Sequence, residues 1–300
     1  MSASRWLGAL ALDLAFGEPP AAIHPVVLLG RAIAQLEAIA PRAPAAQLAH
    51  GALLVAGPAI AATASGVAVR GLRPRVFRTF AALWLLKTTF ALRGLVVAGD
   101  TVAHDLESGD VAGARTHLRT LVSRPTGELD APHVASAVIE SLAENLCDSY
   151  VAPLLWYRLG GLPAALAYRA VNTADAMVGY HGPYEHLGKA AARLDDVLNL
   201  VPARLTALAL AVAAPLVGLR GREALRGAWR EHARTESPNA GWPMAAAAGA
   251  CGVWLEKAGH YRLGGERVPA ARDVRRARTL ALAGATVATI ALLAVARRDG

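Results

Sequence analysis

The chain has little cysteine, little charge and few aromatic residues. Its 300 residues include only two cysteines, Cys147 and Cys251, which excludes a disulfide framework, and their spacing matches no metal-binding motif. Aromatic residues make up 5% of the chain and charged residues 18%. A chain with so little charge lies outside the usual composition of soluble globular proteins.

Sequence motifs of the common enzyme classes are also missing. The chain contains no Gly-x-x-x-x-Gly-Lys-Ser/Thr loop, no Gly-x-Gly-x-x-Gly after a strand, no His-Glu-x-x-His and no Gly-x-Ser-x-Gly. These patterns would have indicated phosphate-binding loops, dinucleotide folds, zinc peptidases or serine hydrolases. Any catalysis must therefore use another set of residues.

Hydrophobic residues, mainly Ala, Leu and Val, make up 54% of the chain, and the mean hydropathy is +0.34. This composition predicts an all-α, polytopic helical membrane protein with about four to six membrane segments of roughly 20 residues each. Some of these segments are expected to be broken or re-entrant. The clearest spans are 51–69 and 279–296; 205–219 and 240–255 are shorter, 79–98 contains Lys87 and Arg93, and 151–168 contains Gly160, Gly161 and Pro163.

We expect residues 1–300 to form a single integral-membrane domain with a soluble helical insertion around 100–130, where charged residues and chain breakers are frequent. The N-terminal apolar run is short, and Asp13 and Glu18 bracket its end without a small-residue cleavage pattern. The sequence therefore predicts that the N-terminus is retained and not removed as a signal peptide.

The net charge is +8, and arginines gather at the ends of apolar segments, in 70–78, 220–230 and 272–278. Clusters in such places are typical of cytoplasmic loops and of contacts with anionic lipid headgroups. No aromatic-interleaved basic groove accompanies them, so the sequence argues against nucleic acid as a partner. The lipid bilayer is the expected partner.

Polar residues are concentrated between Glu140 and Arg204. Glu140, Glu144 and Asp148 lie four residues apart and therefore share one face of a predicted helix over 135–150. Three acids on one stripe repel one another unless a positive group binds there. Two interpretations remain open, a solvated helix face and a site for a ligand or cation.

A second stripe, Tyr168, Asn172, Asp175 and Gly179, follows helical spacing. It fits either an interhelical hydrogen-bond seam or a binding surface. Asp195 and Asp196 come next, with Asn199 one turn further on, and offer the oxygen ligands that Mg²⁺ takes together with phosphate. The alternative is a self-neutralising surface cluster with Arg193.

The segment Ser237-Pro-Asn-Ala-Gly-Trp-Pro243 cannot continue a helix, because it holds two prolines and a glycine. It predicts an ordered turn before a helix over 244–255. Ser237 and Asn239 are candidate caps of that helix, and a helix N-terminus can also hold an anion.

Several of these motifs together resemble the CobD/CbiB family of cobalamin biosynthesis, the integral-membrane adenosylcobinamide-phosphate synthases. The resemblance runs nearly end to end. It rests on Leu12-Asp13, Gly17-Glu-Pro-Pro20, His24-Pro25-Val26, Glu140-Ser-Leu-Ala-Glu144-Asn145, Tyr168-Arg-Ala-Val-Asn172-Thr, Asp175 to Tyr180, Ala191-Ala-Arg-Leu-Asp195-Asp196, Ser237 to Pro243 and Asp273-Val-Arg-Arg276.

The resemblance implies that ATP drives amide-bond formation between a carboxylate of adenosylcobyric acid and the amine of aminopropanol or its phosphate. Such a ligation activates the carboxylate as an acyl phosphate, which requires a divalent cation, positive groups around the phosphates and an acceptor for the amine proton. Mg²⁺, ATP and a corrinoid are thus the expected cofactor, cosubstrate and substrate. Other corrinoid-pathway enzymes are possible partners.

The resemblance also assigns candidate roles. Asp195 and Asp196 are expected to hold Mg²⁺, while Glu140, Glu144 and Asp148 are expected to act in catalysis, by binding metal or the amine. His24 is a candidate proton acceptor, although a histidine before proline in a turn is more often structural. The expected substrate-binding residues are Asn145, Arg169, Asn172, Asp175, Lys189, Arg193, Arg204 and Asn239, with the arginines and the lysine at phosphates, and with Asn172 and Asp175 at the corrin side-chain amides.

Two other functions fit buried charge in an apolar chain. A transporter of a charged solute is one, but it predicts inverted repeats, and none is visible in the sequence. A non-catalytic membrane scaffold for corrinoid assembly is the other, and it predicts that the polar residues between Glu140 and Asn199 tolerate substitution. The family resemblance favours the ligase.

An ATP-dependent enzyme in the bacterial inner membrane must present its catalytic face to the cytoplasm. The positive-inside rule also places 70–78 inside. If 79–98 crossed the bilayer completely, residues 100–130 would emerge outside, so we expect a non-standard element at 79–98 or 151–168.

Labelling of single cysteines at positions 110 and 185 with an impermeant reagent in intact cells tests this topology. We expect both sites to be protected until the cells are opened, because the catalytic face is cytoplasmic. Rapid labelling of both sites from outside would contradict an ATP-dependent ligase.

Overall fold

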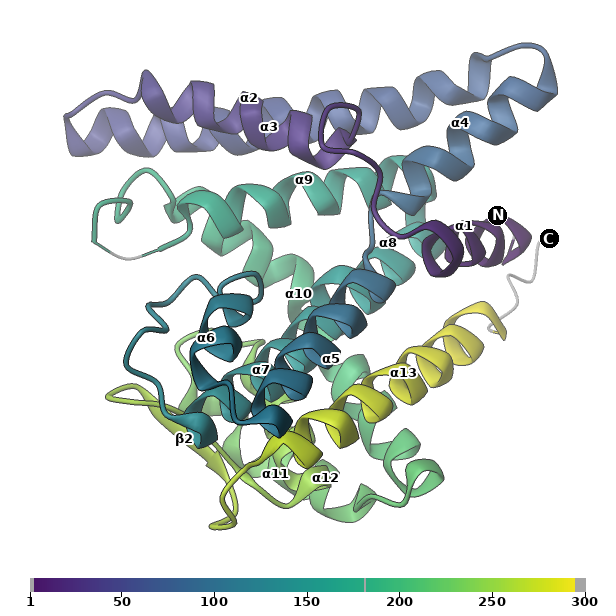
Figure 1. Ribbon diagram of the computed structural model, residues 1–300. Coiled ribbons are helices and arrows are strands. Elements are labelled where there is room, and N and C mark those ends of the chain that lie inside the picture. The colour runs from purple at the N-terminus through teal and green to yellow at the C-terminus, as the bar shows by residue number, and fades with distance from the viewer. Residues whose placement is uncertain (1–2, 181, 295–300) are drawn as a thin grey trace. The chain divides into compact units, whose positions relative to one another are not determined.

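The computed structural model describes residues 3–180 and 182–294 (Figure 1), and the chain divides into two compact units. One unit contains Met1–Ala91 and Ala152–Asn199, and the other contains Leu92–Val151 and Leu200–Gly300. Both units are built from helices, with one short β-hairpin in the second. The predicted all-α class is therefore confirmed.

Helices alone make up the secondary structure described for the first unit. Its elements are α1 (Ala3–Phe16), α2 (Pro25–Ala38), α3 (Pro44–Ala68), the 3₁₀ turn Val69–Gly71, α4 (Arg75–Lys87), α8 (Ala152–Gly160), α9 (Leu162–Val178) and the first part of α10 (Lys189–Ala213). Proline starts α2 and α3, in the first turn where a missing N–H costs nothing. Helices α2 and α3 pack along α9 (Figure 1), burying Ile33, Leu54, Val171 and Val178.

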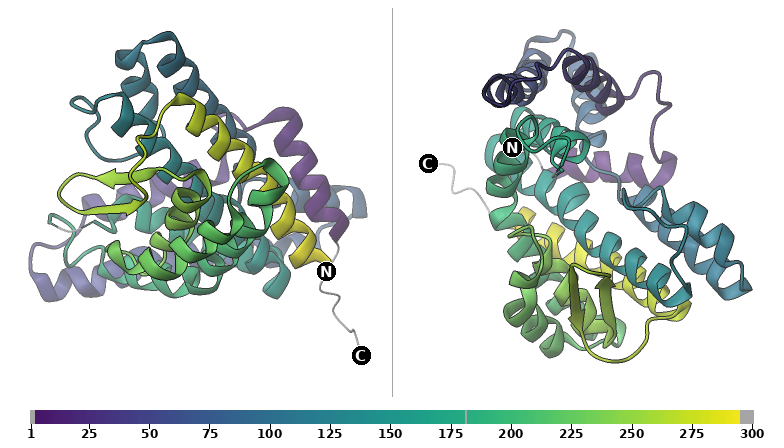
Figure 2. Two further views of the ribbon diagram at one scale, coloured as in Figure 1. Left: turned by 90° about the horizontal axis from the view of Figure 1, so that it is seen from below. Right: turned by 90° about the vertical axis from the view of Figure 1, so that its left-hand side faces the viewer.

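The second unit surrounds one buried helix, α7 (Ala131–Leu146). Its other elements are α5 (Leu92–Ser108), α6 (Val111–Leu118), the π-helical turn Cys147–Val151, the rest of α10, the 3₁₀ turns Ala214–Val217 and His232–Arg234, α11 (Gly221–Glu231), α12 (Gly241–Cys251), β1 (Trp254–Lys257), β2 (Tyr261–Gly264) and α13 (Ala271–Ala294). Strands β1 and β2 form an antiparallel pair (Figure 2). Lys257 lies opposite Tyr261 in this pair. Helices α5, α6, α12 and α13 and strand β1 all pack on α7.

Four candidate membrane spans are long and apolar enough to cross a bilayer within the described residues: Pro44–Gly71, Arg75–Ser108, Lys189–Val217 and Ala271–Ala294. They contain the span predicted at 51–69 and all but the last two residues of the one at 205–219. They also contain most of the one at 279–296, whose last two residues lie outside the described part. The chain is thus a polytopic helical membrane protein.

The other predicted segments are interrupted. Residues 151–168 contain the end of the π-helical turn, α8 and the start of α9, separated at Gly161, whose φ of 80° ends the helix. Within the candidate span Arg75–Ser108, α4 ends at Lys87 and α5 begins at Leu92. Residues 240–255 do not form a span, because α12 ends at the left-handed Gly252 and the chain turns into β1.

The segment 100–130 contains the end of α5, helix α6 and a loop. Asp110 caps α6 by accepting a hydrogen bond from the backbone N–H of Gly113 at 2.8 Å. Val102, Ala114 and Leu118 are completely buried in the core of the second unit. Part of this segment is therefore core structure, beyond the short surface helices that its charge predicted.

A buried ion-pair network explains how Lys87 is tolerated in an apolar segment. The Lys87 side chain is 4% exposed, and its Nζ lies 3.1 Å from Oδ1 of the fully buried Asp13 and also donates to Glu18. Glu18 in turn accepts from Nε2 of His24 at 2.7 Å. Burial raises the pKa of the Glu18 carboxyl, but its bonds to His24 and Lys87 outweigh burial and lower that pKa overall. The network joins α1, the loop before α2, and α4.

Replacing Lys87 with Met is expected to destabilise the protein by about 3–5 kcal/mol, because it leaves Asp13 as an uncompensated buried charge. A double variant, D13N/K87M, should recover part of this loss, since it removes both charges. Thermal unfolding in detergent measures the effect, with exposed Lys189→Met as the matched control. Equal midpoints for K87M and K189M would show that the network does not stabilise the fold.

Candidate active site

The predicted site residues belong to both units, and each set is described within its own unit. The first unit contains His24, Arg169, Asn172, Asp175, Lys189, Arg193, Asp195 and Asp196, and the second contains Glu140, Glu144, Asn145, Asp148, Arg204 and Asn239.

Asp195 is the centre of a buried hydrogen-bond cluster between α9 and α10. Its Oδ2 accepts from Nδ2 of Asn199 at 2.9 Å, and its Oδ1 accepts from Nδ2 of Asn172 at 3.2 Å. The Tyr168 hydroxyl donates to Oδ1 of Asn199 at 3.0 Å, and Arg169 donates to Oδ1 of Asn172 at 3.2 Å. Asp195 and Asn199 are 8% and 2% exposed. The stripe predicted on α9 therefore forms an interhelical seam that holds a carboxylate.

Helical spacing builds this cluster from local sequence. Tyr168 and Asn172 are four residues apart on α9, and Asp195 and Asn199 are four apart on α10, so each pair shares one helix face. Buried polar groups need partners, and here each side-chain amide links two groups. The result is a rigid carboxylate with fixed orientation.

The remaining predicted residues of the first unit lie on or near these helices. Asp196 is half-buried, whereas Lys189 and Arg193 are exposed in the first two turns of α10. Asp175 lies over Gly179: a Cβ at Gly179 would come within 2.0 Å of the Asp175 Oδ1, so this close approach requires glycine.

His24 has a structural role in the network described above. Its Nδ1 accepts from the backbone N–H of Val26 at 3.1 Å and caps α2, while Nε2 therefore carries the proton and donates to Glu18. Both ring nitrogens are engaged and the residue is 8% exposed. The sequence did not predict the network around His24, in which Glu18 binds His24 and Lys87, and Lys87 binds Asp13.

Glu140 forms a second buried cluster, in the other unit. Its Oε1 accepts from the Ser136 hydroxyl at 2.8 Å, and its Oε2 accepts from the Tyr261 hydroxyl at 2.9 Å and from Arg124 at 3.2 Å. Ser136 in turn accepts from the backbone N–H of Glu256 on β1 at 2.8 Å. Hydrogen bonds from Glu256 to Ser136 and from Tyr261 to Glu140 therefore link the β-hairpin to α7.

Burial raises the pKa of the Glu140 carboxyl, although Arg124, Ser136 and Tyr261 act in the opposite direction. Burial and the neighbouring Glu140 also raise the pKa of the Tyr261 hydroxyl, so this group remains a donor at neutral pH. A carboxyl with a raised pKa holds a proton more readily than an exposed carboxyl does, which is a property that general acids and bases use. Such groups are common at functional sites.

The other acids of the predicted stripe have different surroundings. Glu144 and Asp148 are half-buried, and the helix changes to a π-helical turn at Cys147–Val151. Asn145 donates to the carbonyl and hydroxyl of Ser141, both at 3.0 Å. A π-helical turn interrupts regular spacing and is often found at functional sites.

Arg204 and Asn239 form a third polar contact. Arg204 donates to Oδ1 of Asn239 at 3.0 Å, and its guanidinium lies 4.8 Å from the centre of the Trp242 ring. Ser237 caps the turn by accepting from the backbone N–H groups of Asn239 and Ala240, at 3.2 Å and 3.3 Å. Asn239 is 5% exposed and binds Arg204, so it does not cap α12 as the sequence suggested.

Carboxylate oxygens are ligands of hard cations. Mg²⁺ takes one or two carboxylates and completes its shell with water and substrate phosphate oxygens. Asp195 and Asp196 are consecutive residues of α10, and both oxygens of Asp195 accept hydrogen bonds from asparagine amides. Among the described residues, no group of three or more His, Cys, Asp or Glu side chains is placed to hold a metal ion.

The fold and these clusters define a polytopic helical membrane protein with buried, hydrogen-bonded carboxylates. The chain belongs to the CobD/CbiB family, because the family model described as "CobD/Cbib protein" matches residues 6–290. No solved structure matches the chain.

Curated relatives extend along most of the chain. A "Cobalamin biosynthesis protein CobD" of Dehalococcoides mccartyi is 43% identical over 272 residues, covering 88% of this chain and 87% of the relative. A "Probable cobalamin biosynthesis protein CobD" of Pyrococcus furiosus is 42% identical, covering 90% of each. A "Cobalamin biosynthesis protein CbiB" of Salmonella typhimurium is 39% identical, covering 89% of this chain and 86% of the relative.

Glu140→Gln is expected to remove a pH dependence of stability. Because the folded-state pKa of Glu140 is raised above its usual value of 4.5, folding favours the protonated carboxyl. Its contribution is complete below pH 4.5 and is lost as the pH rises through the raised pKa. The unfolding midpoint of the parent protein should therefore fall across this window more than that of E140Q.

The half-buried Glu144→Gln is the matched control for this measurement and should keep the pH profile of the parent. Superimposable profiles for E140Q and the parent would contradict the raised pKa.

Proposed function

We propose that the chain is an ATP-dependent ligase of cobalamin biosynthesis that joins aminopropanol or its phosphate to a carboxylate of adenosylcobyric acid. Membership of the CobD/CbiB family and the printed names of the relatives support the pathway. The observation that carries the chemistry is the buried Asp195, fixed by two asparagine amides and followed directly by Asp196. The product would be adenosylcobinamide or its phosphate.

The proposed ligation takes place in two steps. The corrinoid carboxylate attacks the γ-phosphorus of ATP, forming an acyl phosphate and releasing ADP. The amine then attacks the acyl carbon, the C–O bond to phosphate breaks, and the amide and inorganic phosphate are formed. One proton leaves the amine nitrogen during the second step.

In this proposal Asp195 and Asp196 hold Mg²⁺, which when bound neutralises charge on the phosphate oxygens. The Asn172 and Asn199 amides keep the Asp195 carboxylate in one orientation. Arg169, bound to Asn172 at 3.2 Å, places a positive charge beside this cluster. The exposed Lys189 and Arg193, in the first turns of α10, are the proposed phosphate contacts in the same unit.

Glu140 is the proposed acceptor of the amine proton. Its burial favours the protonated form, so it can hold a proton after the amine attacks. Ser136, Tyr261 and Arg124 all donate to it, which fixes both oxygens. Arg204, with Asn239 and Trp242 beside it, is a further proposed substrate contact.

We also propose that the protein lies in the bacterial inner membrane with its catalytic face in the cytoplasm, where ATP is present. Arginine clusters at the ends of the candidate spans support this orientation.

Reconstitution tests the proposal. Purified protein, adenosylcobyric acid, ATP, Mg²⁺ and aminopropanol or its phosphate are incubated, and the amide product is measured by mass spectrometry. We expect product only when ATP and an amine are both present. A protein that binds the corrinoid without forming product with either amine would favour the scaffold, and vectorial uptake into vesicles would favour the transporter.

The double variant D195N/D196N is expected to lower turnover by at least about a hundredfold, the scale seen when charge stabilisation is removed from a transition state. Protein yield should be unchanged. Exposed Glu128→Gln is the matched control, because it removes a carboxylate elsewhere on the surface. Near-normal turnover by the double variant would exclude these two residues from the reaction.

A further inference from the structure

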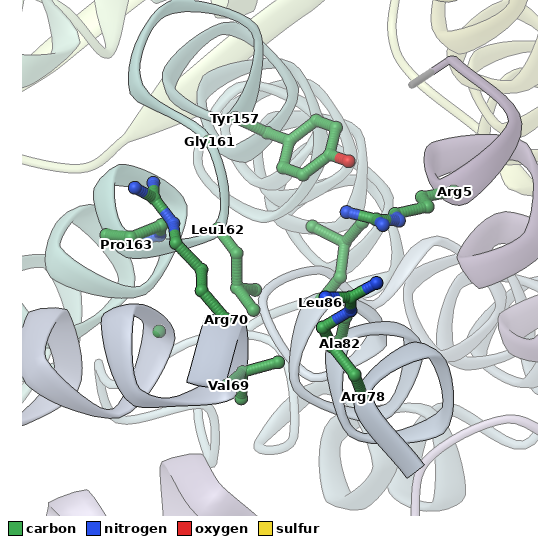
Figure 3. Close-up of a pocket in the computed structure, with 11 residues that line it drawn as sticks. Arg5, Val69, Arg70, Arg78, Ala82, Leu86, Tyr157, Gly161, Leu162 and Pro163 are labelled. Carbon is green, nitrogen blue, oxygen red and sulfur yellow. The ribbon is translucent and has the colours of Figure 1, made fainter. Parts of the chain in front are cut away.

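A basic cavity of about 310 Å³ lies in the first unit, away from the Asp195 cluster (Figure 3). Its wall comes from α1, the end of α3 with the following turn, α4, and the junction of α8 and α9. Arg5, Arg70 and Arg78 contribute three guanidinium groups, and none of the described residues that line it is acidic. The cavity is therefore strongly positive.

No carboxylate of the described residues neutralises the positive charge of this cavity. Across residues 3–180 and 182–294, none of the three arginines forms an ion pair with a carboxylate, although thirteen other basic side chains do. The Nε of Arg78 is buried and has no hydrogen-bond partner in the described part of the chain. Figure 3 shows the guanidinium groups of Arg5 and Arg78 on one side of the cavity and that of Arg70 on the opposite side, beside Pro163. Like charges around one cavity repel one another unless an anion lies between them.

Tyr157 supplies an independent observation. The residue is 5% exposed, lines the cavity, and its hydroxyl makes no hydrogen bond to the described residues. The ring packs 5.8 Å from that of Trp6, so the side chain is fixed, and Figure 3 shows its hydroxyl on the side of Arg5. Burial raises the pKa of this hydroxyl although Arg5 lowers it, and the group remains a hydrogen-bond donor at neutral pH.

The start of α9 adds a further positive contribution. Gly161, Leu162 and Pro163 line the cavity, and they are the N-cap and first residues of a 17-residue helix. The dipole of such a helix favours an anion at its N-terminus. Gly66 allows α3 to approach closely, because a Cβ there would lie 2.8 Å from the Cα of Pro163.

The cavity lies at an end of two candidate membrane spans. Arg70 is within the last turn of Pro44–Gly71, and Arg78 is in the first turn of Arg75–Ser108. Val76, Phe77 and Phe80 in the same part of α4 are 76%, 64% and 68% exposed, which suits contact with acyl chains. This is the depth at which headgroup phosphates and cytosolic phosphate esters both reach a membrane protein.

We propose that this cavity binds a phosphate group, held by Arg5, Arg70 and Arg78 and by the hydroxyl of Tyr157. The chemistry is that of guanidinium groups and a neutral donor on a phosphate monoester or diester. Two sources share this chemistry, an anionic phospholipid headgroup and a soluble phosphate ester. The site is separate from the proposed ligation residues and does not depend on that function.

Binding to the full chain in neutral detergent tests the proposal. One arm adds short-chain phosphatidylglycerol, with phosphatidylcholine of equal chain length for comparison, and the other adds inorganic phosphate or ATP without Mg²⁺. We expect R5Q/R78Q to weaken phosphate binding by about tenfold or more, the scale of losing charge-assisted hydrogen bonds. Tyr157→Phe should weaken it by a smaller factor.

Arg73→Gln and Arg75→Gln are the matched controls, because they remove the same kind of charge close to Arg78 in sequence, just before and at the start of α4, and do not line the cavity. Specific binding of phosphatidylglycerol identifies the lipid source, and binding of phosphate or ATP identifies the soluble source. The proposal is overturned if neither probe binds, or if the control variants weaken binding as much as R5Q/R78Q. If R5Q/R78Q does not fold, the comparison of Y157F with R73Q decides by the same criterion.

Discussion

The ion pairs of Lys87 with Asp13 and Glu18 are the interaction that allows charged side chains to be buried in the first unit of this membrane protein. Lys87 stands in an apolar segment where an isolated charge would cost several kcal/mol. The ion pairs make that position tolerable and join α1 to α4. Because Lys87 and Asp13 neutralise each other, both charged side chains can be buried in apolar helices without contact with water.

The same constraint shapes both proposed catalytic clusters. Asp195 is nearly buried and is bound by two amides, and Glu140 is buried and receives three donors. A carboxylate held in this way cannot rotate away from a substrate, and its proton affinity is set by its surroundings. The cavity of Arg5, Arg70 and Arg78 differs, because its charges find no carboxylate in the described residues. That difference is what points to a ligand there.

Much of the fold follows from hydrophobic runs and chain breakers. Most of the predicted span 51–69 lies in α3, and the predicted span 205–219 begins in α10 and runs past its end at Ala213. Gly161 separates α8 from α9, as the glycine and proline content predicted. The β-hairpin was not predicted, because Trp254–Lys257 directly follows an alanine-rich helix and its partner strand is only four residues long. Within the segment 79–98, α4 ends at Lys87 and α5 begins at Leu92, and the ion pairs of Lys87 with Asp13 and Glu18 join residues that lie far apart in the sequence.

The candidate site was predictable where partners lie one helical turn apart. Asp195 and Asn199 could be paired from spacing alone. Spacing also places Tyr168 and Asn172 on one face of α9, although each of them binds a residue of α10. Tyr261 could not, since it lies 121 residues from Glu140 and reaches it through the hairpin. Arg70 and Arg78 were interpreted only as markers of topology, because a cavity formed by several helices leaves no local signal in sequence.

Transfer of oxygen-18 tests the central claim, that the chain activates a corrinoid carboxylate with ATP, most directly. Adenosylcobyric acid labelled in its reacting carboxylate is incubated with purified protein, ATP, Mg²⁺ and the amine, and the released phosphate is analysed by mass spectrometry. The account predicts that label appears in inorganic phosphate in step with amide formation. Amide formed without label in phosphate would contradict an acyl phosphate, and the absence of any amide would contradict the ligase itself.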